Sequence, residues 1–553
     1  MAPRSGTAPF GADAERPPGG AGAVLAALVA ALVVAIAAAA PFLPALGQGY
    51  LAWDDAATLV DNPRVRGLTP ENVAWMFTTF HKGPYQPLSW LSYGLEHEIH
   101  GLDPGLCHLT NVLLHAANAV LVFALARSLA RARGVPGGEA LFAATAAALV
   151  FGPHPLRVES VAWATERRDV LSGLFLLGAT LLHLRSVESG RGRDRAGAAV
   201  AFALSLLAKA SGLLWPVALL VLDALVPRRA AAGVKGLLAE KIPLFLLAAG
   251  AAALAIAGQK SAGAMEGLST HGVAERAAQC GYGLFFYAAA TAFPLGLSAL
   301  HEMPRGHVAL DPAVLAGGLA ALAVAALVFR FRKRAPALAA ALLAYAVLVS
   351  PVLGAAQSGN QIVATRYSYL PCVPLALLAG FSLARWRTRL GARAVVPALA
   401  AATLALGVLA FQTTRLWASD LRLWERAIRL DAENSVARYN RGLARRLAGD
   451  VGGAVADFSE AIRLRPRWPS PLMNRGNARL ESGDTAGAIE DYSAVIGLGS
   501  GSLARAYAYR AAARAREGEL EGALADIEAA LRIEPGEPDF EASAAMLREA
   551  LGR

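Results

Sequence analysis

The sequence predicts an all-α protein in two parts, a bundle of membrane-spanning helices followed by an array of helical repeats. Hydrophobic residues make up 55% of the 553 residues and charged residues only 17%, against about 25% charged residues in an ordinary soluble domain. After residue 411 the composition becomes charged and amphipathic, and a 34-residue spacing recurs. A soluble chain could not bury so much apolar surface, so the lipid bilayer is its second solvent.

The N-terminus predicts a tail and then an anchor. Residues 1–20 are rich in Pro, Gly and Ala and are expected to be disordered. The run 21–46 contains no charge and is long enough to cross a bilayer. A cleaved signal peptide would have an apolar core of about 7 to 15 residues, so a retained anchor is favoured.

Ten further apolar stretches give about eleven spans in a membrane domain of residues 21–411. These stretches lie near 106–126, 139–152, 169–184, 196–208, 212–226, 242–258, 312–329, 336–355, 368–384 and 394–411. The short ones are interpreted as tilted or broken helices inside the bundle. The apolar segment 277–300 is interpreted as a re-entrant or surface helix on the outer side, because a crossing there would place a basic cluster outside.

Basic clusters set the orientation. They lie at 127–133, 185–195, 228–241, 330–334 and 385–393, and the positive-inside rule makes them cytoplasmic. The loops 47–105, 152–168, 259–311 and 356–366 and the region 412–553 are then on the outer face. The net charge of +10 therefore reports orientation and requires no nucleic-acid partner. Three widely spaced cysteines indicate neither a zinc site nor a disulfide framework.

Residues 412–553 carry the repeat. Asn440-Arg441-Gly442 recurs as Asn474-Arg475-Gly476, and Asp457-Phe458 recurs as Asp491-Tyr492. A third copy is displaced by one residue, and Trp424 with Ala427 marks a half-repeat before the first copy. This is the tetratricopeptide pattern, which stacks helix pairs into an α-solenoid. We expect about three repeats and a half-repeat, with a capping helix near 538–553.

The first outer loop contains an acidic pair, Asp54 and Asp55. Two adjacent carboxylates just beyond a span repel each other, which suits a general base, a metal ligand or both. The competing interpretation is a solvated loop that ends the helix. No metal-ligand spacing accompanies the pair, so a divalent metal ion at Asp54 or Asp55 stays open.

A second set of polar residues lies between apolar spans on the same face. It comprises His154, Arg157, Glu159, Glu166, Arg167, Arg168, Asp169, Lys209, Arg366 and Tyr367. Arginine binds phosphate in a bidentate manner, so a phosphate site is one interpretation. The alternatives are a salt-bridged loop and, for Lys209, a side chain that snorkels to the interface. His108 and His115, seven residues apart, are better explained by core packing.

These motifs resemble the transmembrane and tetratricopeptide-repeat O-mannosyltransferase family, and its bacterial branch in particular. The resemblance extends over nearly the whole chain after residue 20. It rests on Trp53-Asp54-Asp55, Asn62-Pro63, Tyr85-Gln86-Pro87-Leu88, His108-Leu109-Thr110-Asn111, His115, His154-Pro155, Glu159-Ser160-Val161-Ala162-Trp163, Glu166-Arg167-Arg168-Asp169-Val170-Leu171 and Thr365-Arg366-Tyr367-Ser368-Tyr369-Leu370-Pro371.

The resemblance implies a GT-C type glycosyltransferase fold, with a multispanning helix bundle and an active site on the non-cytoplasmic side. It implies transfer of a sugar, mannose or another hexose, from a polyprenyl-phosphate carrier to a protein Ser/Thr hydroxyl. Asp54 and Asp55 match the family's acidic pair, and one of them is expected to be the general base. Arg157, Arg167, Arg168, Lys209 and Arg366 are the candidates for the carrier phosphate on chemical grounds. A single displacement implies inversion at the sugar carbon, by analogy with inverting glycosidases.

The repeats would form a groove for an extended acceptor protein or peptide. About three repeats are fewer than many relatives have, which weakens that inference. The competing functions are a non-catalytic tetratricopeptide scaffold for envelope proteins and a lipid-linked sugar transporter. An anchor needs only one span, and a transporter predicts internal symmetry that the sequence lacks. The Ala- and Arg-rich composition suggests a bacterial inner membrane with the repeats in the periplasm.

Overall fold

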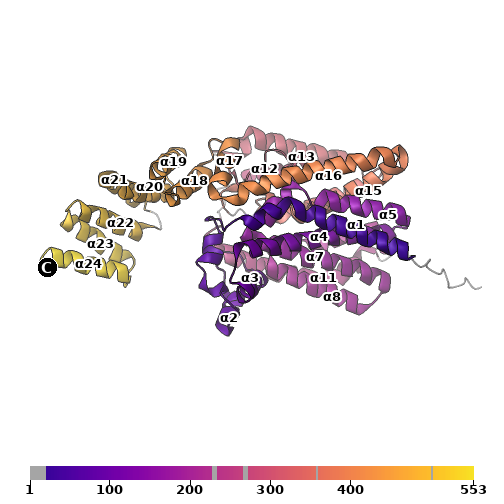
Figure 1. The fold of residues 1–553 in the computed structure, drawn as a ribbon, viewed down its shortest axis with the longest axis horizontal. Coiled ribbons are helices and arrows are strands. Elements are labelled where there is room, and N and C mark those ends of the chain that lie inside the picture. The colour runs from indigo at the N-terminus through magenta and orange to yellow at the C-terminus, as the bar shows by residue number, and fades with distance from the viewer. Residues whose placement is uncertain are drawn as a thin grey trace, which may run out of the picture.

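A computed structural model of the chain describes residues 20–226, 229, 233–265, 272–304, 306–355, 359–499 and 502–553. The predicted tail, apart from Gly20, lies outside the described residues, as do parts of the basic cluster 228–241 and of the loops 259–311 and 356–366. The described chain is helical apart from one two-stranded sheet, which confirms the predicted all-α class. A bundle of long helices forms one end of the molecule, and the repeat array forms the other end (Figure 1).

The bundle runs from α1 to α16. Its helices are α1 (Ala21–Ala39), α4 (Pro104–Ala132), α5 (Gly137–Phe151), α6 (Val158–Ala162), α7 (Arg167–Ser189), α8 (Gly192–Ala208), α9 (Trp215–Leu225), α11 (Gly233–Ser261), α12 (Val273–Ala292), α13 (Pro312–Phe331), α14 (Pro336–Val349), α15 (Val373–Leu390) and α16 (Ala392–Thr414). The first outer loop holds α2 (Pro70–Thr78) and α3 (Pro87–His100). Both lie at the end of the bundle that faces the repeats (Figure 1).

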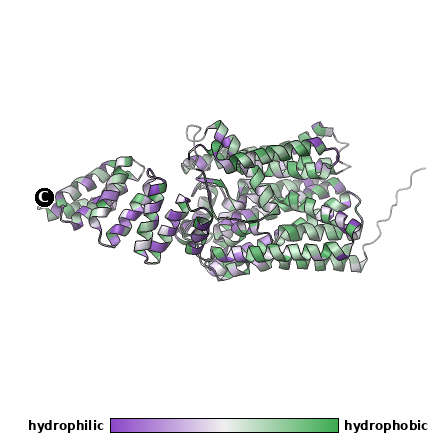
Figure 2. Ribbon diagram, turned by 90° about the horizontal axis from the view of Figure 1, so that it is seen from above, coloured by the Kyte–Doolittle hydropathy of each residue, from purple (hydrophilic) through white to green (hydrophobic). Residues whose placement is uncertain are grey.

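Six described helices are long and apolar enough to cross a membrane, and a seventh span arises if α5 and the segment Pro155–Ala162, bent by 60°, count as one. The other predicted spans correspond to α8, α9, α14 and α15, which are too short or too charged to pass this test. The protein is therefore a multi-pass membrane protein, and the number of about eleven crossings stays a prediction. Apolar residues predominate along the bundle, whereas polar residues alternate with apolar ones in the repeats (Figure 2).

The segment predicted to be re-entrant forms α12. Nη1 of Arg276, near its start, donates to the carbonyl oxygen of Ala355. Oγ1 of Thr291, near its end, lies 3.0 Å from Sγ of Cys372. Both ends of α12 thus contact the segment 355–372, which contains the outer loop before α15. The prediction that α12 does not cross the membrane stays a prediction.

Small residues allow the bundle helices to approach closely. This is usual in membranes, where close packing rather than the hydrophobic effect drives helix association. A Cβ at Gly380 of α15 would collide with the carbonyl oxygen of Ala143 in α5. A Cβ at Gly152, just after α5, would lie 2.7 Å from Cβ of Ala38 in α1. These contacts fix α5 between its two neighbours.

The repeat array consists of antiparallel helix pairs, as the 34-residue spacing predicts. Its helices are α17 (Asp420–Leu430), α18 (Ser435–Leu447), α19 (Val451–Leu464), α20 (Pro469–Glu481), α21 (Thr485–Leu498), α22 (Leu503–Arg516), α23 (Leu520–Ile533) and α24 (Pro538–Ala550). In the first complete pair the ring of Phe458 packs on Gly442, where a Cβ would lie 2.6 Å from the ring. Tyr492 packs on Gly476 at the same distance in the second pair.

The sheet connects the array to the bundle. Strand β1 (His301–Glu302) pairs antiparallel with β2 (Gln361–Val363). The Glu302 carboxylate accepts hydrogen bonds from the backbone N–H (2.5 Å) and the hydroxyl of Ser435, the first residue of α18. A carboxylate at a helix N-terminus satisfies unpaired N–H groups and the helix dipole. The array is therefore attached to β1, which pairs with β2, the strand that precedes Arg366.

Candidate functional site

Asp55 is buried and both of its carboxylate oxygens are occupied. Oδ2 accepts from the backbone N–H of Leu51 and Oδ1 from that of Thr165, each at 3.0 Å. Burial raises the pKa of Asp55 to about 7, although the two N–H donors oppose the shift. Asp55 therefore ties the turn that carries the acidic pair to the segment just before α7.

Asp54 differs from its neighbour. Its side chain is only partly buried, and its carboxylate makes no hydrogen bond or ion pair with any described residue. A carboxylate with free oxygens on a fixed turn is available to accept a proton from a bound hydroxyl. Of the two acids, Asp54 thus has the geometry of a base and Asp55 that of a support.

Aromatic stacking connects the acidic turn to a group of basic residues. The ring of Trp53 stacks on Trp163, with centroids 4.5 Å apart and planes at 18°. The guanidinium carbon of Arg366 lies 5.7 Å from the centroid of the same Trp163 ring. Thr165, which Asp55 holds, is followed directly by Glu166. Trp163 and the segment that follows it therefore contact both the acidic turn and the basic group.

The basic group consists of Arg168, Lys209 and Arg366, and it surrounds the fully buried Glu166. Nε of Arg168 lies 3.1 Å from Oε2 of Glu166, and Nζ of Lys209 lies 2.9 Å from the same oxygen. Nε of Arg366 lies 3.4 Å from Oε1. Lys209 also pairs with Asp169 at 2.7 Å. Five of the predicted residues thus meet at one place.

Glu159 and Tyr367 hold Arg366 in position. The Glu159 carboxylate pairs with the Arg366 guanidinium and accepts from its backbone N–H at 2.8 Å. The ring of Tyr367 lies 4.9 Å from the guanidinium carbon. Together with Glu166, these groups hold the pKa of Arg366 well above its usual value. Arg366 therefore remains charged and is paired with carboxylates within the protein.

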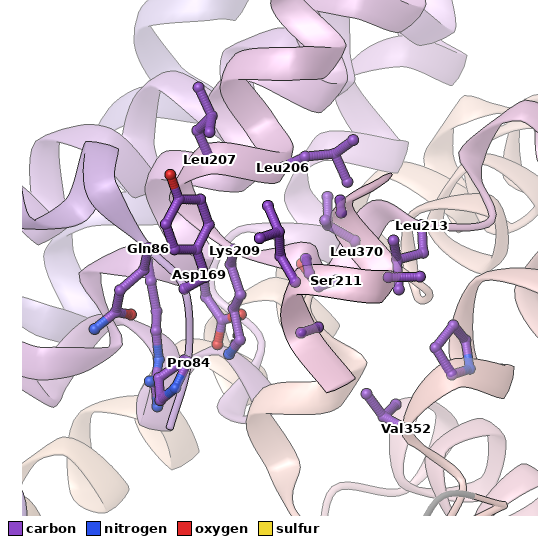
Figure 3. A pocket seen from close by; sticks show the side chains of 18 of the residues that line it. Pro84, Gln86, Asp169, Leu206, Leu207, Lys209, Ser211, Leu213, Val352 and Leu370 are labelled. Atoms are coloured by element: carbon purple, nitrogen blue, oxygen red, sulfur yellow. Dashed lines mark ion pairs between the residues drawn. The ribbon is translucent and has the colours of Figure 1, made fainter. Parts of the chain in front are cut away.

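Arg168, Lys209 and Arg366 line one end of a cavity of about 730 Å³. Most of its wall is apolar and comes from α8, α11 and the segment before α15. Figure 3 shows Gln86, Asp169 and Lys209 on one side of this cavity and Leu213, Leu370 and Val352 on the other. The arrangement suits a molecule with one charged end and a long hydrocarbon part.

Three of the predicted substrate-binding residues, Arg157, His154 and Arg167, make other contacts. Arg157 is buried and donates from Nη1 to the carbonyl oxygens of Ser368 and Tyr369 at 3.0 and 2.8 Å. His154 is buried; its Nδ1 accepts from a backbone N–H and its Nε2 lies 3.0 Å from the carbonyl oxygen of Thr291. Both side chains thus bind mainly backbone groups, although the buried Nε of Arg157 has no hydrogen-bond partner among the described residues.

Arg167 is the third. It is fully buried, and its Nη1 pairs with Glu96 of α3 at 2.5 Å. Nε donates to Asn111 and Nη2 to the carbonyl oxygen of Cys107, each at 2.9 Å. Arg167 therefore holds α3, α4 and α7 together, and each of its three guanidinium nitrogens already donates to a protein group.

The sequence interpretation left out two contributors to the site. Gln86 lines the cavity, and its buried Oε1 has no hydrogen-bond partner among the described residues. Trp163 supports the stacking described above. Both belong to motifs that carry the family resemblance, but neither has a titratable group to mark it. His108 and His115 are buried in the bundle, in agreement with core packing.

A metal ion does not fit the acidic pair. Among the described residues, no group of three or more His, Cys, Asp or Glu side chains is placed to hold a metal. Both oxygens of Asp55 are already bound to backbone N–H groups, so only Asp54 could contribute a ligand. No step proposed below uses a metal.

The chain has relatives among curated protein O-mannosyl-transferases. It is 34% identical over 154 residues to protein O-mannosyl-transferase TMTC1 of Mus musculus, covering 26% of this chain and 15% of that protein. It is 32% identical over 166 residues to protein O-mannosyl-transferase TMTC2 of Mus musculus, covering 29% of this chain and 19% of that protein. It is 27% identical over 161 residues to protein O-mannosyl-transferase F38B6.6 of Caenorhabditis elegans (27% and 22%). The chain thus matches less than a quarter of the length of each of these three relatives.

No protein-family model matches the chain. Among solved structures, similar chains include the first TPR of Spaghetti (RPAP3) bound to an HSP90 peptide, with 24% identity and a TM-score of 0.21 over 22% of this chain and 97% of that one. Another is the Arabidopsis OM64 TPR domain, with 26% identity and a TM-score of 0.21 over 21% of this chain and 97% of that one.

Proposed function

We propose that this chain is a GT-C type protein O-glycosyltransferase that uses a polyprenyl-phosphate-linked hexose, such as mannose, and modifies Ser or Thr hydroxyls. The observation that carries the proposal is one juxtaposition. Trp53, which directly precedes Asp54, stacks on Trp163, and Arg366 of the basic group that lines the apolar cavity lies 5.7 Å from the centroid of the same ring. The names of the curated relatives agree with this reaction class.

The cavity supports a lipid-linked donor over a nucleotide sugar. Its wall is mostly aliphatic, which would bury a polyprenyl chain but would leave a nucleotide's polar groups unpaired. The phosphate would meet the basic end. No described residue accepts from Nη1 of Arg168 or Nη2 of Arg366, so both guanidinium groups retain donors for phosphate oxygens.

The reaction would be a single displacement. Asp54 takes the proton of the acceptor hydroxyl while the hydroxyl oxygen forms a bond to the anomeric carbon of the sugar. The bond from that carbon to the phosphate oxygen breaks, and the polyprenyl phosphate leaves. Arg168, Lys209 and Arg366 stabilise the negative charge that develops on the leaving group. The anomeric configuration is inverted, and Asp54 later releases its proton to solvent.

The location follows from the same proposal. The predicted orientation places the acidic pair, the basic group and the repeats on the non-cytoplasmic face, which is the periplasm if the membrane is a bacterial inner membrane. The repeats would receive the acceptor protein. Their helix pairs provide the extended surface that such arrays use for segments of other proteins.

The full chain in lipid nanodiscs tests the reaction. Mannose bound to polyprenyl phosphate and mannose bound to a nucleotide are each supplied with a Ser/Thr-containing acceptor peptide. We expect inverted product from the lipid-linked donor and none from the nucleotide donor. Transfer from the nucleotide donor would contradict the assignment of the cavity. No transfer from either donor by folded protein would contradict the transferase proposal.

Lys209 provides a sharper test of the phosphate site. Lys209→Met is expected to lower kcat/KM for the lipid-linked donor about 10- to 100-fold, because a hydrogen bond to a charged group contributes about 1.5–3 kcal/mol. The variant leaves Asp169 with an unpaired charge, so the matched control is the double variant Lys209→Met/Asp169→Asn. The double variant should recover folding but not donor use. Full recovery of kcat/KM would show that Lys209 serves Asp169 alone.

A further inference from the structure

Helix α17 is the second half of a repeat whose first helix is missing. Trp424 precedes Phe458 by 34 residues and Tyr492 by 68, so the three aromatic residues occupy the same repeat position. In the first two complete repeats this aromatic residue packs on a glycine of the first helix, Gly442 or Gly476. The described chain places no such helix before α17, because α16 belongs to the bundle.

The first outer loop supplies an aromatic partner for Trp424. The ring of Trp424 is fully buried and meets the ring of Trp53 edge-on, with centroids 4.8 Å apart at 66°. The other side of Trp53 is stacked on Trp163. Trp53 directly precedes Asp54. The aromatic residue of the half-repeat therefore packs on the turn that carries the proposed base.

A second residue of α17 differs from its equivalents in the complete repeats and also contacts the acidic turn. At the position of Asp420 the complete repeats have alanine, in each case buried: Ala454, Ala488 and Ala523. Oδ2 of Asp420 accepts a hydrogen bond of 3.0 Å from the backbone N–H of Ala52, two residues before Asp54. A position that holds alanine in the complete repeats thus holds an aspartate here, and this aspartate accepts a hydrogen bond from the acidic turn.

A third position is changed because its partner is absent. The complete repeats have Asp457, Asp491 and Asp526, each paired with an arginine of the first helix (Arg441, Arg475 and Arg510) at 2.6 to 2.7 Å. The half-repeat has the buried Leu423 at this place. A buried carboxylate without that arginine would be costly. The sequence of α17 therefore fits the loop rather than another repeat helix.

We propose that α17 is a positioning element of the active site, in which Asp420 and Trp424 fix the turn of Asp54 without touching substrate. This inference rests on the proposed role of Asp54 as base. It gives the repeat domain a part in the chemical step in addition to any acceptor binding. A displacement of about 1 Å at a reacting group can cost about 10²-fold in rate, so the contacts of α17 matter for kcat.

Variants of the full chain in nanodiscs test this proposal. Asp420→Ala restores the residue of the complete repeats and removes the acceptor for the Ala52 N–H, whereas Asp420→Asn keeps an acceptor oxygen. We expect Asp420→Ala to lower kcat about 10- to 100-fold without a change in the KM for the polyprenyl-phosphate donor. Asp420→Asn should stay close to wild type.

Trp424→Leu should behave like Asp420→Ala. Its matched control is Tyr492→Leu, which truncates the equivalent residue in a repeat remote from the acidic turn and should leave kcat unchanged. Wild-type kcat in both Asp420→Ala and Trp424→Leu would overturn the positioning role. A rise in the acceptor KM alone, at unchanged kcat, would overturn it too, because α17 would then act in acceptor binding. Full activity of Asp54→Asn, in contrast, would overturn the role of Asp54 as base, and no transfer by the folded wild-type protein would overturn the proposed function itself.

Discussion

Replacement of Asp54 by Asn is expected to lower kcat for sugar transfer by about 10²- to 10⁴-fold, the range that general base catalysis contributes. Asn keeps the size of the side chain but cannot take the proton of the acceptor hydroxyl. Because the Asp54 carboxylate has no partner among the described residues, its loss should change the free energy of unfolding by no more than about 0.5 kcal/mol. Steady-state kinetics and thermal unfolding of the same preparations measure both effects.

Asp55→Asn is the matched comparison, since it makes the same chemical change one residue away. The Asn amide can accept from only one of the two N–H groups that Asp55 binds, those of Leu51 and Thr165. We therefore expect a lower unfolding temperature together with reduced activity. Wild-type activity of Asp54→Asn, with complete loss in a well-folded Asp55→Asn, would exchange the roles of the two acids.

Replacement of Arg167 by Met is expected to lower the free energy of unfolding by about 3–5 kcal/mol, because it leaves the buried Glu96 charge unpaired. The substitution also removes the donors to Asn111 and to the carbonyl oxygen of Cys107. Equilibrium unfolding in mixed micelles measures the loss. Any remaining folded protein should keep the wild-type KM for the donor.

Arg463→Met is the control for Arg167→Met. Arg463 is exposed and pairs with Glu460 on the same helix, so its removal should cost less than about 1 kcal/mol. If Arg167→Met had wild-type stability but a raised donor KM, Arg167 would belong to the phosphate site after all.

The fold was largely predictable because it depends on periodic patterns. A 34-residue spacing with glycines opposite aromatic residues is sufficient to identify stacked helix pairs. Long uncharged runs identify membrane helices. The limits of the shorter spans were less certain, because α8, α9 and α14 are shorter than the bilayer is thick and their burial depends on packing with other helices.

The choice of site residues depended on directions that a sequence does not contain. Arg167 and Arg168 are neighbours at the start of α7, and adjacent residues of a helix point about 100° apart. One therefore faces α3 and α4, and the other faces the cavity. The same holds for the acidic pair, in which Asp55 turns inward and Asp54 does not. The sequence indicated which segments hold the candidate residues, but the contacts of each residue required the structure.

The attachment of the array by Glu302 and α17 has a consequence for chimaeric proteins. Composition places the border between the two parts at residue 411, yet Asp420, Trp424 and Ser435 all contact the bundle or its loops. An exchange of arrays between relatives at that border would separate these residues from their partners. A junction after Trp468, just before α20, would keep them together and would also keep Arg465, which pairs with Glu302 at 3.6 Å. The exchanged part should therefore begin with α20, and α17 to α19 should be kept with the membrane part.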